Sequence, residues 1–398
     1  MTGRATQAQG RRRRAGGRRL DDRLVAALVF LAATAWHLAV ARRALGDRAD
    51  LAFFGADTAR VLRHMAVRGP MLDRGQFHPL FPLLTQPPVR ALMALGLGRV
   101  ASGQVVMAAY GGVLAAAVYG TGRRRRLPVG SALAPAALAA VAGASVVFGA
   151  VPETFGVSAA LASVVVFLAA GWQRPPRLVE SAGALVLGGA AVVTGALVPV
   201  VAVWRAEPSW SRRIAAAGAA LGAFVGLLAI QAIVIGTRFH LTADGEDAFV
   251  RHDRLAGAGD SLRTLLASGW SLPAPRLVGG VVTVDGAAGP GDALGLAALV
   301  LLAVLWALTA LGVWWQRQDR LVPVLLVGIV AHVVLFALYG DEAFLYAVLV
   351  VPLVLGLVIV AASGTLRRPV VLACWLLVPV LAVVNVGALD DAARLVGA

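Results

Sequence analysis

Long apolar runs separated by short polar segments dominate the chain. A helix needs roughly 20 apolar residues to cross about 30 Å of hydrocarbon, and many runs approach that length. They cover residues 24–42, 101–120, 129–149, 154–171, 213–236, 292–314, 321–338, 345–362 and 370–388. The pattern predicts an all-α, polytopic membrane protein.

The apolar stretch 79–97 contains Pro82, Pro87, Pro88 and Arg90. If it crossed the membrane, the arginines at 123–126 would lie outside, against the positive-inside rule. We therefore expect it to lie on the outer face as an interfacial helix.

Residues 179–204 are flanked by arginines at both ends, which predicts a hairpin of two short arms turning near Thr194, Gly195 and Pro199. Arms of about 12 residues reach only about 18 Å. The turn must then be covered by protein or line a wet cavity, because lipid cannot satisfy its backbone groups.

These choices give about 11 membrane helices, counting both hairpin arms, with the amino end inside and the carboxyl end outside. All the basic turns then face the cytoplasm; they are 123–126, 174–177, 205–213, 317–320 and 367–368. We expect a disordered basic tail (1–23), one membrane domain (24–388) and an extracytoplasmic tail (389–398). The long outer loops of the membrane domain are 43–100 and 237–291.

Composition supports this class of protein. Hydrophobic residues make up 59% of the chain and charged residues 14%, against about a quarter in soluble domains. The formal charge of +15 comes from arginines in the tail and the turns, which points to membrane lipid as a partner and away from nucleic acid. Cys374 is the single cysteine, so no intramolecular disulfide can form.

The apolar runs contain almost no charge, whereas ion-coupled transporters usually carry charged groups at mid-membrane. Candidate chemistry therefore falls on the outer loops. Asp57 begins a helical pattern and can be its N-cap or a general base, since a carboxylate is ionised at neutral pH. Arg60, Arg63 and His64 follow on that helix, where they can anchor lipid headgroups or bind a phosphate.

His78 lies in a proline-restricted segment, Gln76 to Pro82, and can be a structural hydrogen-bonding residue or a ligand. With Asp57, Asp73 and His64 nearby, a divalent metal stays open as an alternative, although the spacing matches no metal motif.

Acids at later helix starts are secondary candidates. Glu153 stands where the helix dipole favours an anion, so a capping role is the favoured interpretation. Asp341 and Glu342 lie at the mouth of a later helix on the same predicted face.

The order of these features resembles the glycosyltransferase C superfamily of integral membrane sugar transferases. The resemblance covers roughly residues 20–240: a first span, Phe54-Gly55-Ala56-Asp57, an amphipathic helix, His78-Pro79-Leu80-Phe81-Pro82 and a Gly-rich hairpin at 188–197. The chain has Asp57-Thr58 where many members have Asp-Glu, and its first loop lacks an Asp-X-Asp motif.

The resemblance implies inverting transfer of a hexose or pentose from a polyprenyl-phosphate donor to a glycan, lipid or protein acceptor at the extracytoplasmic face. Asp57 takes the role of the catalytic base, and His78 lies in the segment that borders the site in relatives. Four arginines are candidates for neutralising the departing phosphate: Arg60, Arg63, Arg74 and Arg238.

Two alternatives to a transferase stay open. One is a lipid-linked-sugar transporter or flippase, with the 179–204 hairpin and His332 lining the path. The other is a non-catalytic membrane partner of a cell-envelope enzyme.

Overall fold

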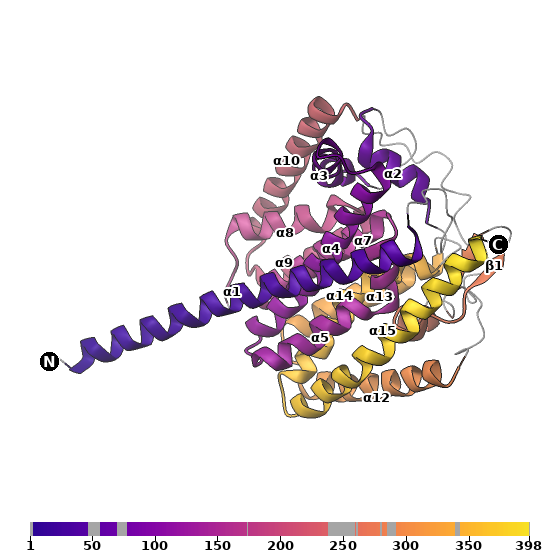
Figure 1. Cartoon of the computed structure of the whole chain (residues 1–398). Coiled ribbons are helices and arrows are strands. Elements are labelled where there is room, and N and C mark those ends of the chain that lie inside the picture. The colour runs from indigo at the N-terminus through magenta and orange to yellow at the C-terminus, as the bar shows by residue number, and fades with distance from the viewer. Residues whose placement is uncertain are drawn as a thin grey trace.

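Helices account for nearly all of the described chain (Figure 1). The computed structural model describes residues 3–46, 56–69, 78–172, 174–237, 259, 262–278, 281–284, 292–338 and 343–397, with side chains from residue 21 onward. The elements are α1 (Gly3–Ala44), α2 (Thr58–Ala66), α3 (Phe81–Ala94), α4 (Arg99–Arg124), α5 (Val129–Val141), α6 (Gly143–Ala150), α7 (Thr154–Ala170), α8 (Leu178–Ala190), η1 (Val193–Ala196), α9 (Leu197–Ala206), α10 (Trp210–Ile235), η3 (Thr264–Ser268), β1 (Arg276–Val278), β2 (Val281–Thr283), α12 (Ala293–Trp315), α13 (Leu321–Leu338), α14 (Ala343–Ala362) and α15 (Arg367–Gly397).

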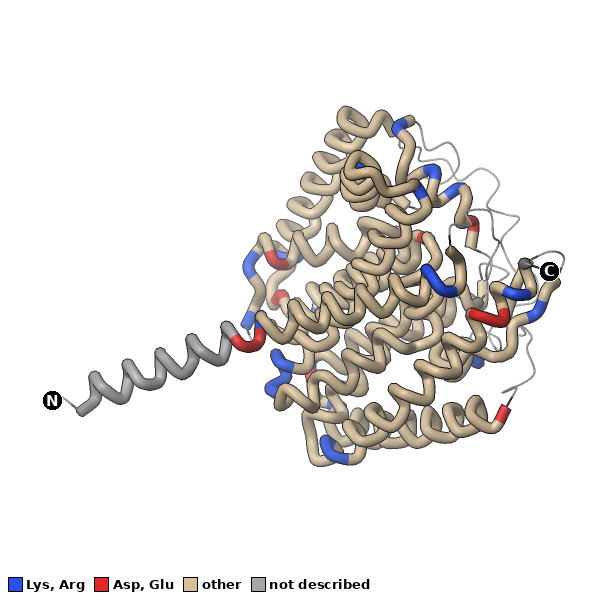
Figure 2. The backbone as a smooth tube through the Cα atoms, in the orientation of Figure 1, with Lys and Arg blue, Asp and Glu red and all other residues tan. Residues whose placement is uncertain are grey.

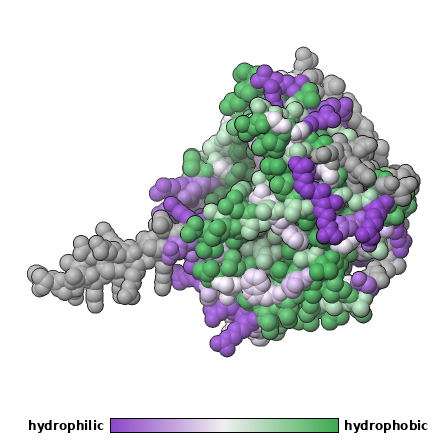
Figure 3. All heavy atoms as spheres, in the orientation of Figure 1, coloured by the Kyte–Doolittle hydropathy of each residue, from purple (hydrophilic) through white to green (hydrophobic). Residues whose placement is uncertain are grey.

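Seven described helices are long and apolar enough to cross a membrane, or eight if α5 and α6 form one span. Figure 3 shows hydrophobic side chains covering the middle of the bundle and hydrophilic ones gathered toward its ends. The chain is therefore a multi-pass, all-α membrane protein, as predicted. The expected count of eleven also needs α7, α8 and α9, which have 17, 13 and 10 residues and are shorter than a full crossing.

The basic turns gather at one end of the bundle, called here the basic end (Figure 2). Arg123 pairs with Asp22 at 2.8 Å, and Arg125 pairs with Asp319. Side-chain hydrogen bonds to backbone carbonyls link further segments at this end: Arg124 Nη1 to Phe167 O, Arg212 Nη2 to Pro176 O and Gln316 Nε2 to Val360 O. The turns thus share one end, in agreement with the charge pattern. The opposite end is called the far end below.

The predicted hairpin is formed by α8, η1 and α9. Its arms approach closely at two glycines, because a Cβ on Gly195 would lie 2.3 Å from Gly188 O, and one on Gly188 would lie 2.4 Å from Pro199 Cγ. The tip is covered by protein, with Ala190 and Ala191 buried. The backbone carbonyl of Ala190 accepts a hydrogen bond from Leu80 N.

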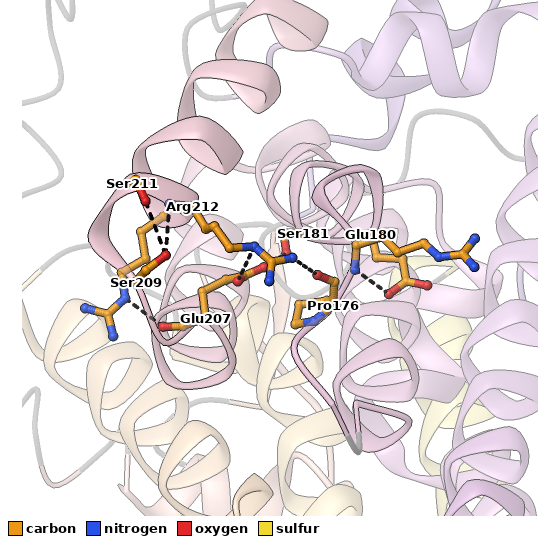
Figure 4. A network of polar contacts seen from close by, with 9 residues as sticks. Pro176, Glu180, Ser181, Glu207, Ser209, Ser211 and Arg212 are labelled. Carbon is orange, nitrogen blue, oxygen red and sulfur yellow. Dashed lines mark hydrogen bonds and ion pairs between the residues drawn. The ribbon is translucent and has the colours of Figure 1, made fainter.

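A polar network joins the two feet of this hairpin at the basic end (Figure 4). The buried Glu207 side chain pairs with Arg212 at 3.3 Å and accepts a hydrogen bond from Ser181 Oγ at 3.2 Å. Arg213 Nε donates to the Glu207 carbonyl at 3.0 Å. The network satisfies an otherwise isolated buried acid and fixes where the hairpin enters and leaves.

The expected single span 129–149 is instead two helices, α5 and α6, which meet at Ala142 and are bent by 61°. The bend, called here the elbow, interrupts the helical hydrogen-bond ladder in an apolar region, where free backbone groups are strongly unfavourable. Four of the freed groups, the carbonyls of Ala140 and Val141 and the amides of Gly143 and Ala144, have partners from distant parts of the chain. The expected straight helix is therefore broken, although the pair can still form one bent span. The local pattern does not predict the break, because these partners lie far away in the sequence.

The partners at the elbow come from α1, α15 and the segment after η3. His37 Nε2 donates to Ala140 O at 2.9 Å, and Asn385 Nδ2 donates to Val141 O at 2.7 Å. The amides of Gly143 and Ala144 donate to the carbonyls of Trp270 and Gly269, each at 2.8 Å. The elbow is therefore stabilised by hydrogen bonds from three distant parts of the chain.

Helix α3 lies across the far end, and Figure 1 looks almost along its axis while α1, α12 and α15 run across the view. Two glutamines hold it there. Gln86 Nε2 donates to the carbonyls of His64 and Val67 at 2.9 and 2.6 Å, and Gln231 bonds both Leu83 N and Pro79 O. This arrangement agrees with the expected interfacial helix.

Both ends of the described chain are helical. Helix α1 begins at Gly3, within the segment 1–23 expected as a disordered tail. Helix α15 continues to Gly397 through most of the expected tail 389–398, because Leu389 and Ala392 are fully buried and Asp390 pairs with Arg43 at 2.5 Å. The described part of the second long loop contains η3 and an antiparallel β1–β2 pair.

Candidate functional site

Asp57 caps helix α2 at the far end. Its Oδ1 accepts a hydrogen bond from the Arg60 amide at 3.3 Å, and its Oδ2 lies 3.2 Å from Arg60 Nε. The apolar face of α2 fixes this position, since Val61, Leu62 and Met65 are buried. Leu62 fits against Gly103 of α4, where an added Cβ would come within 2.4 Å of Leu62 Cδ2. The predicted cap and amphipathic helix are confirmed.

Glu153 caps helix α7 in the short turn that follows α6. Its Oε1 accepts hydrogen bonds from the Thr154 amide at 2.7 Å and from Thr154 Oγ1 at 2.8 Å. The residue is only 5% exposed, whereas the Asp57 side chain is 49% exposed. The favoured capping role is confirmed, but a surface cap would not need this degree of burial.

Asp57, Arg60 and Glu153 form one group, called here the acid–arginine cluster. The Asp57 backbone and the Arg60 charge both act electrostatically on the Glu153 carboxylate. Burial raises the pKa of Glu153 above its ordinary value, while the hydrogen bonds from Thr154, the Asp57 backbone and the Arg60 charge act in the opposite direction. Arg60 thus pairs with the exposed carboxylate of Asp57 and also acts electrostatically on the buried carboxylate of Glu153.

His78 borders this cluster from the segment before α3. Its Nδ1 donates to the Ala191 carbonyl at the hairpin tip at 3.0 Å, and its Nε2 lies 3.5 Å from Thr154 Oγ1. The ring packs edge-on against Phe155, with ring centroids 6.0 Å apart. His78 is buried and connects the hairpin tip to the start of α7.

An aromatic group that the sequence analysis missed continues from Phe155. The Phe155 ring meets Tyr346 at 4.9 Å, and Tyr346 stacks on Phe336 at 4.8 Å. These residues lie within apolar runs, where an aromatic side chain is usually a packing residue. Only the structure, which brings Phe155 against His78, distinguishes these aromatic residues from ordinary packing residues.

The remaining predicted site residues are distributed differently. Arg63 is exposed on α2, and His64 is half-buried with its carbonyl held by Gln86. Arg74, Arg238, Asp341 and Glu342 lie outside the described residues. Within the described ranges, no three His, Cys, Asp or Glu side chains come together as a metal site.

The raised pKa of Glu153 predicts a pH-dependent stability. The folded state holds this proton more tightly than the unfolded chain, so the stabilisation is complete below the ordinary pKa of 4.5 and is lost as the pH rises through the raised value. Glu153→Gln should remove this loss, and its melting temperature should fall less than that of the wild type over this range. Melting curves of detergent-solubilised protein at several pH values measure it.

Glu180→Gln is the matched control, because Glu180 accepts a hydrogen bond from the Arg177 amide at the opposite end of the bundle. It should reproduce the wild-type pH profile. A Glu153→Gln profile parallel to that of the wild type would contradict the assigned burial of this carboxyl.

No family model matches the sequence, and no curated protein or solved structure is significantly similar to it.

Proposed function

We propose that the protein is an inverting glycosyltransferase that moves a sugar from a polyprenyl-phosphate donor to an acceptor at the far end of the bundle. The observation that carries the proposal is the acid–arginine cluster. Segments far apart in the sequence bring Asp57, Arg60 and Glu153 together at the end opposite the basic turns. A carboxylate beside a guanidinium at a membrane interface suits a reaction that releases a phosphate.

In this proposal Asp57 is the general base. Its side chain is exposed enough to meet an acceptor hydroxyl, takes the proton, and lets the acceptor oxygen attack the anomeric carbon. The bond from that carbon to the phosphate oxygen breaks, and the lipid phosphate leaves with the bonding electrons. Arg60 lies where it can stabilise the new negative charge.

Glu153 is assigned a positioning role. Its carboxyl interacts electrostatically with the Asp57 backbone and with Arg60 from the buried side, so in this proposal it orients both groups without needing contact with the acceptor. His78 and the Phe155 ring pack edge-on beside it and support its position from the interior.

We also propose that the basic end is cytoplasmic and the far end extracytoplasmic, with eleven membrane segments when α7 and both hairpin arms are counted. Retention of positive charge on the cytoplasmic side supports this orientation. A reporter fused after Arg126 should be active only as a cytoplasmic reporter, and an extracytoplasmic signal there would reverse the assignment.

Covalent transfer of label is the direct test of the transferase. Purified protein in sealed proteoliposomes is supplied with polyprenyl-phosphate sugars labelled in the sugar, together with membrane-extracted glycan and lipid acceptors. We expect the label to appear in an acceptor and free polyprenyl phosphate to accumulate. A panel of hexose and pentose donors in which none is consumed would contradict the proposal.

The elbow favours one second candidate, a transporter of lipid-linked sugars, because discontinuous helices recur at transporter binding sites. In that case labelled donor crosses the vesicle membrane without chemical change. The same proteoliposome experiment distinguishes transfer of the labelled sugar to an acceptor from passage of the unchanged donor across the membrane.

A further inference from the structure

A groove at the basic end lies outside the proposed transfer site. It has a volume of about 770 Å³ and runs along α4 between α1 and α7, within the roughly 300–1,000 Å³ range of ligand sites. Its floor is one face of α4, with Val113, Ala116, Ala117 and Gly120 at helical spacing. Phe30 of α1 and Phe167 of α7 form the walls. The body of the groove is thus apolar and faces the lipid region.

The mouth of the groove is positively charged. It carries Arg23, Arg123 and Arg124 against the single acid Asp22, and that acid is already paired with Arg123. Arg124 donates to the carbonyls of Phe167 and Leu168 and lies 3.6 Å from the Phe167 ring centroid. Among the described residues no carboxylate lies within ion-pair distance of Arg23 or Arg124. Glu180, which is not among the groove-lining residues, acts on the Arg124 charge, and Arg23 and Arg124 leave the mouth with a net positive charge.

Tyr119 also lines the groove and is 1% exposed. Within the described part of the chain its hydroxyl has no hydrogen-bond partner. The phenol interacts electrostatically with the Asp22–Arg123 pair at the mouth. A buried hydroxyl without a partner is unfavourable, so this group points to an acceptor supplied by a ligand.

From these three observations we propose that the groove binds an anionic glycerophospholipid of the leaflet at the basic end. One acyl chain lies along the apolar floor, and the phosphate lies at the mouth near Arg23, Arg124 and the Tyr119 hydroxyl. Basic pockets between membrane helices suit such headgroups. A free phosphate would leave the apolar walls uncovered, and a zwitterionic lipid would bring its ammonium group toward the arginines.

Native mass spectrometry of the delipidated full chain, titrated with phosphatidylglycerol, tests this proposal. We expect binding to weaken roughly five-fold in Tyr119→Phe, which keeps the ring and removes only the unpaired hydroxyl. Arg23→Gln should weaken it as well. Arg320→Gln is the control, because it removes an exposed charge from the same end without lining the groove.

A thermal-melting series with the same lipid checks that the variants are folded, since Tyr119→Phe breaks no hydrogen bond of the described protein. Phosphatidylglycerol should raise the melting temperature of the wild type more than that of Tyr119→Phe. Equal binding of phosphatidylcholine, preferential binding of polyprenyl phosphate, or wild-type binding by both Tyr119→Phe and Arg23→Gln would each overturn the proposal.

Discussion

Asp57→Asn is expected to lower sugar transfer by roughly 10²–10⁴-fold, the usual contribution of a general base, while the protein still inserts and folds. Asparagine keeps the side-chain oxygen that caps α2 and serves about as well as aspartate at an N-cap. It loses only the ability to accept the hydroxyl proton and the charge opposite Arg60. The measurement is the initial rate of label transfer from polyprenyl-phosphate sugar in proteoliposomes.

Asp292→Asn provides a matched control for this variant. Asp292 caps α12, also at the far end, and its Oδ1 accepts a hydrogen bond from the Gly295 amide at 2.7 Å. The control should transfer sugar at the wild-type rate. Full activity in Asp57→Asn would end the assignment of Asp57 as the base. Loss of activity in Glu153→Gln alone would move that role to Glu153.

Asn385→Leu is expected to lower the free energy of unfolding by about 3 kcal/mol or more, since each buried polar group left unpaired costs about 1–3 kcal/mol. Asn385 is fully buried. Its Oδ1 accepts from the Leu272 amide at 2.7 Å, and its Nδ2 donates to the carbonyls of Val141 and Trp270 at 2.7 and 2.8 Å. Leucine has a similar volume but leaves the Leu272 amide and the Val141 carbonyl without a partner, while the Trp270 carbonyl keeps its bond from the Gly143 amide. Reversible denaturation in mixed detergent measures the loss.

Thr309→Val is the control for Asn385→Leu. Thr309 is buried and its Oγ1 has no hydrogen-bond partner within the described ranges. Replacing that hydroxyl by a methyl group should leave stability unchanged or raise it slightly. A small effect of Asn385→Leu, similar to that of the control, would show that the elbow does not depend on this side chain.

The sequence was sufficient for those parts of the fold that local composition determines. Apolar length located the long spans, and charge at both ends of 179–204 predicted the α8–α9 hairpin, because a single crossing would have separated the arginines. The elbow at Ala142 could not be predicted in this way. Its neighbours are Val141 and Gly143, and the groups that stabilise it, such as Asn385, lie far away in the sequence.

In the candidate site, too, the features set by the local sequence pattern were predictable, and the contacts between distant segments were not. The Asp57 cap and the buried face of α2 follow from local pattern, and the structure confirms both. The meeting of Glu153 with Asp57 and Arg60 depends on how α6 and α7 are placed after the elbow. No spacing rule within one helix could have predicted that contact.

The elbow also constrains the order of assembly. Its supporting groups come from α1 near the start of the chain, from the segment after η3, and from α15. During synthesis the earlier helices enter the membrane first. The Val141 carbonyl is therefore expected to lack its Asn385 partner until α15 has joined the bundle. The bend between α5 and α6 is then among the last parts of the bundle to gain all of the partners described above.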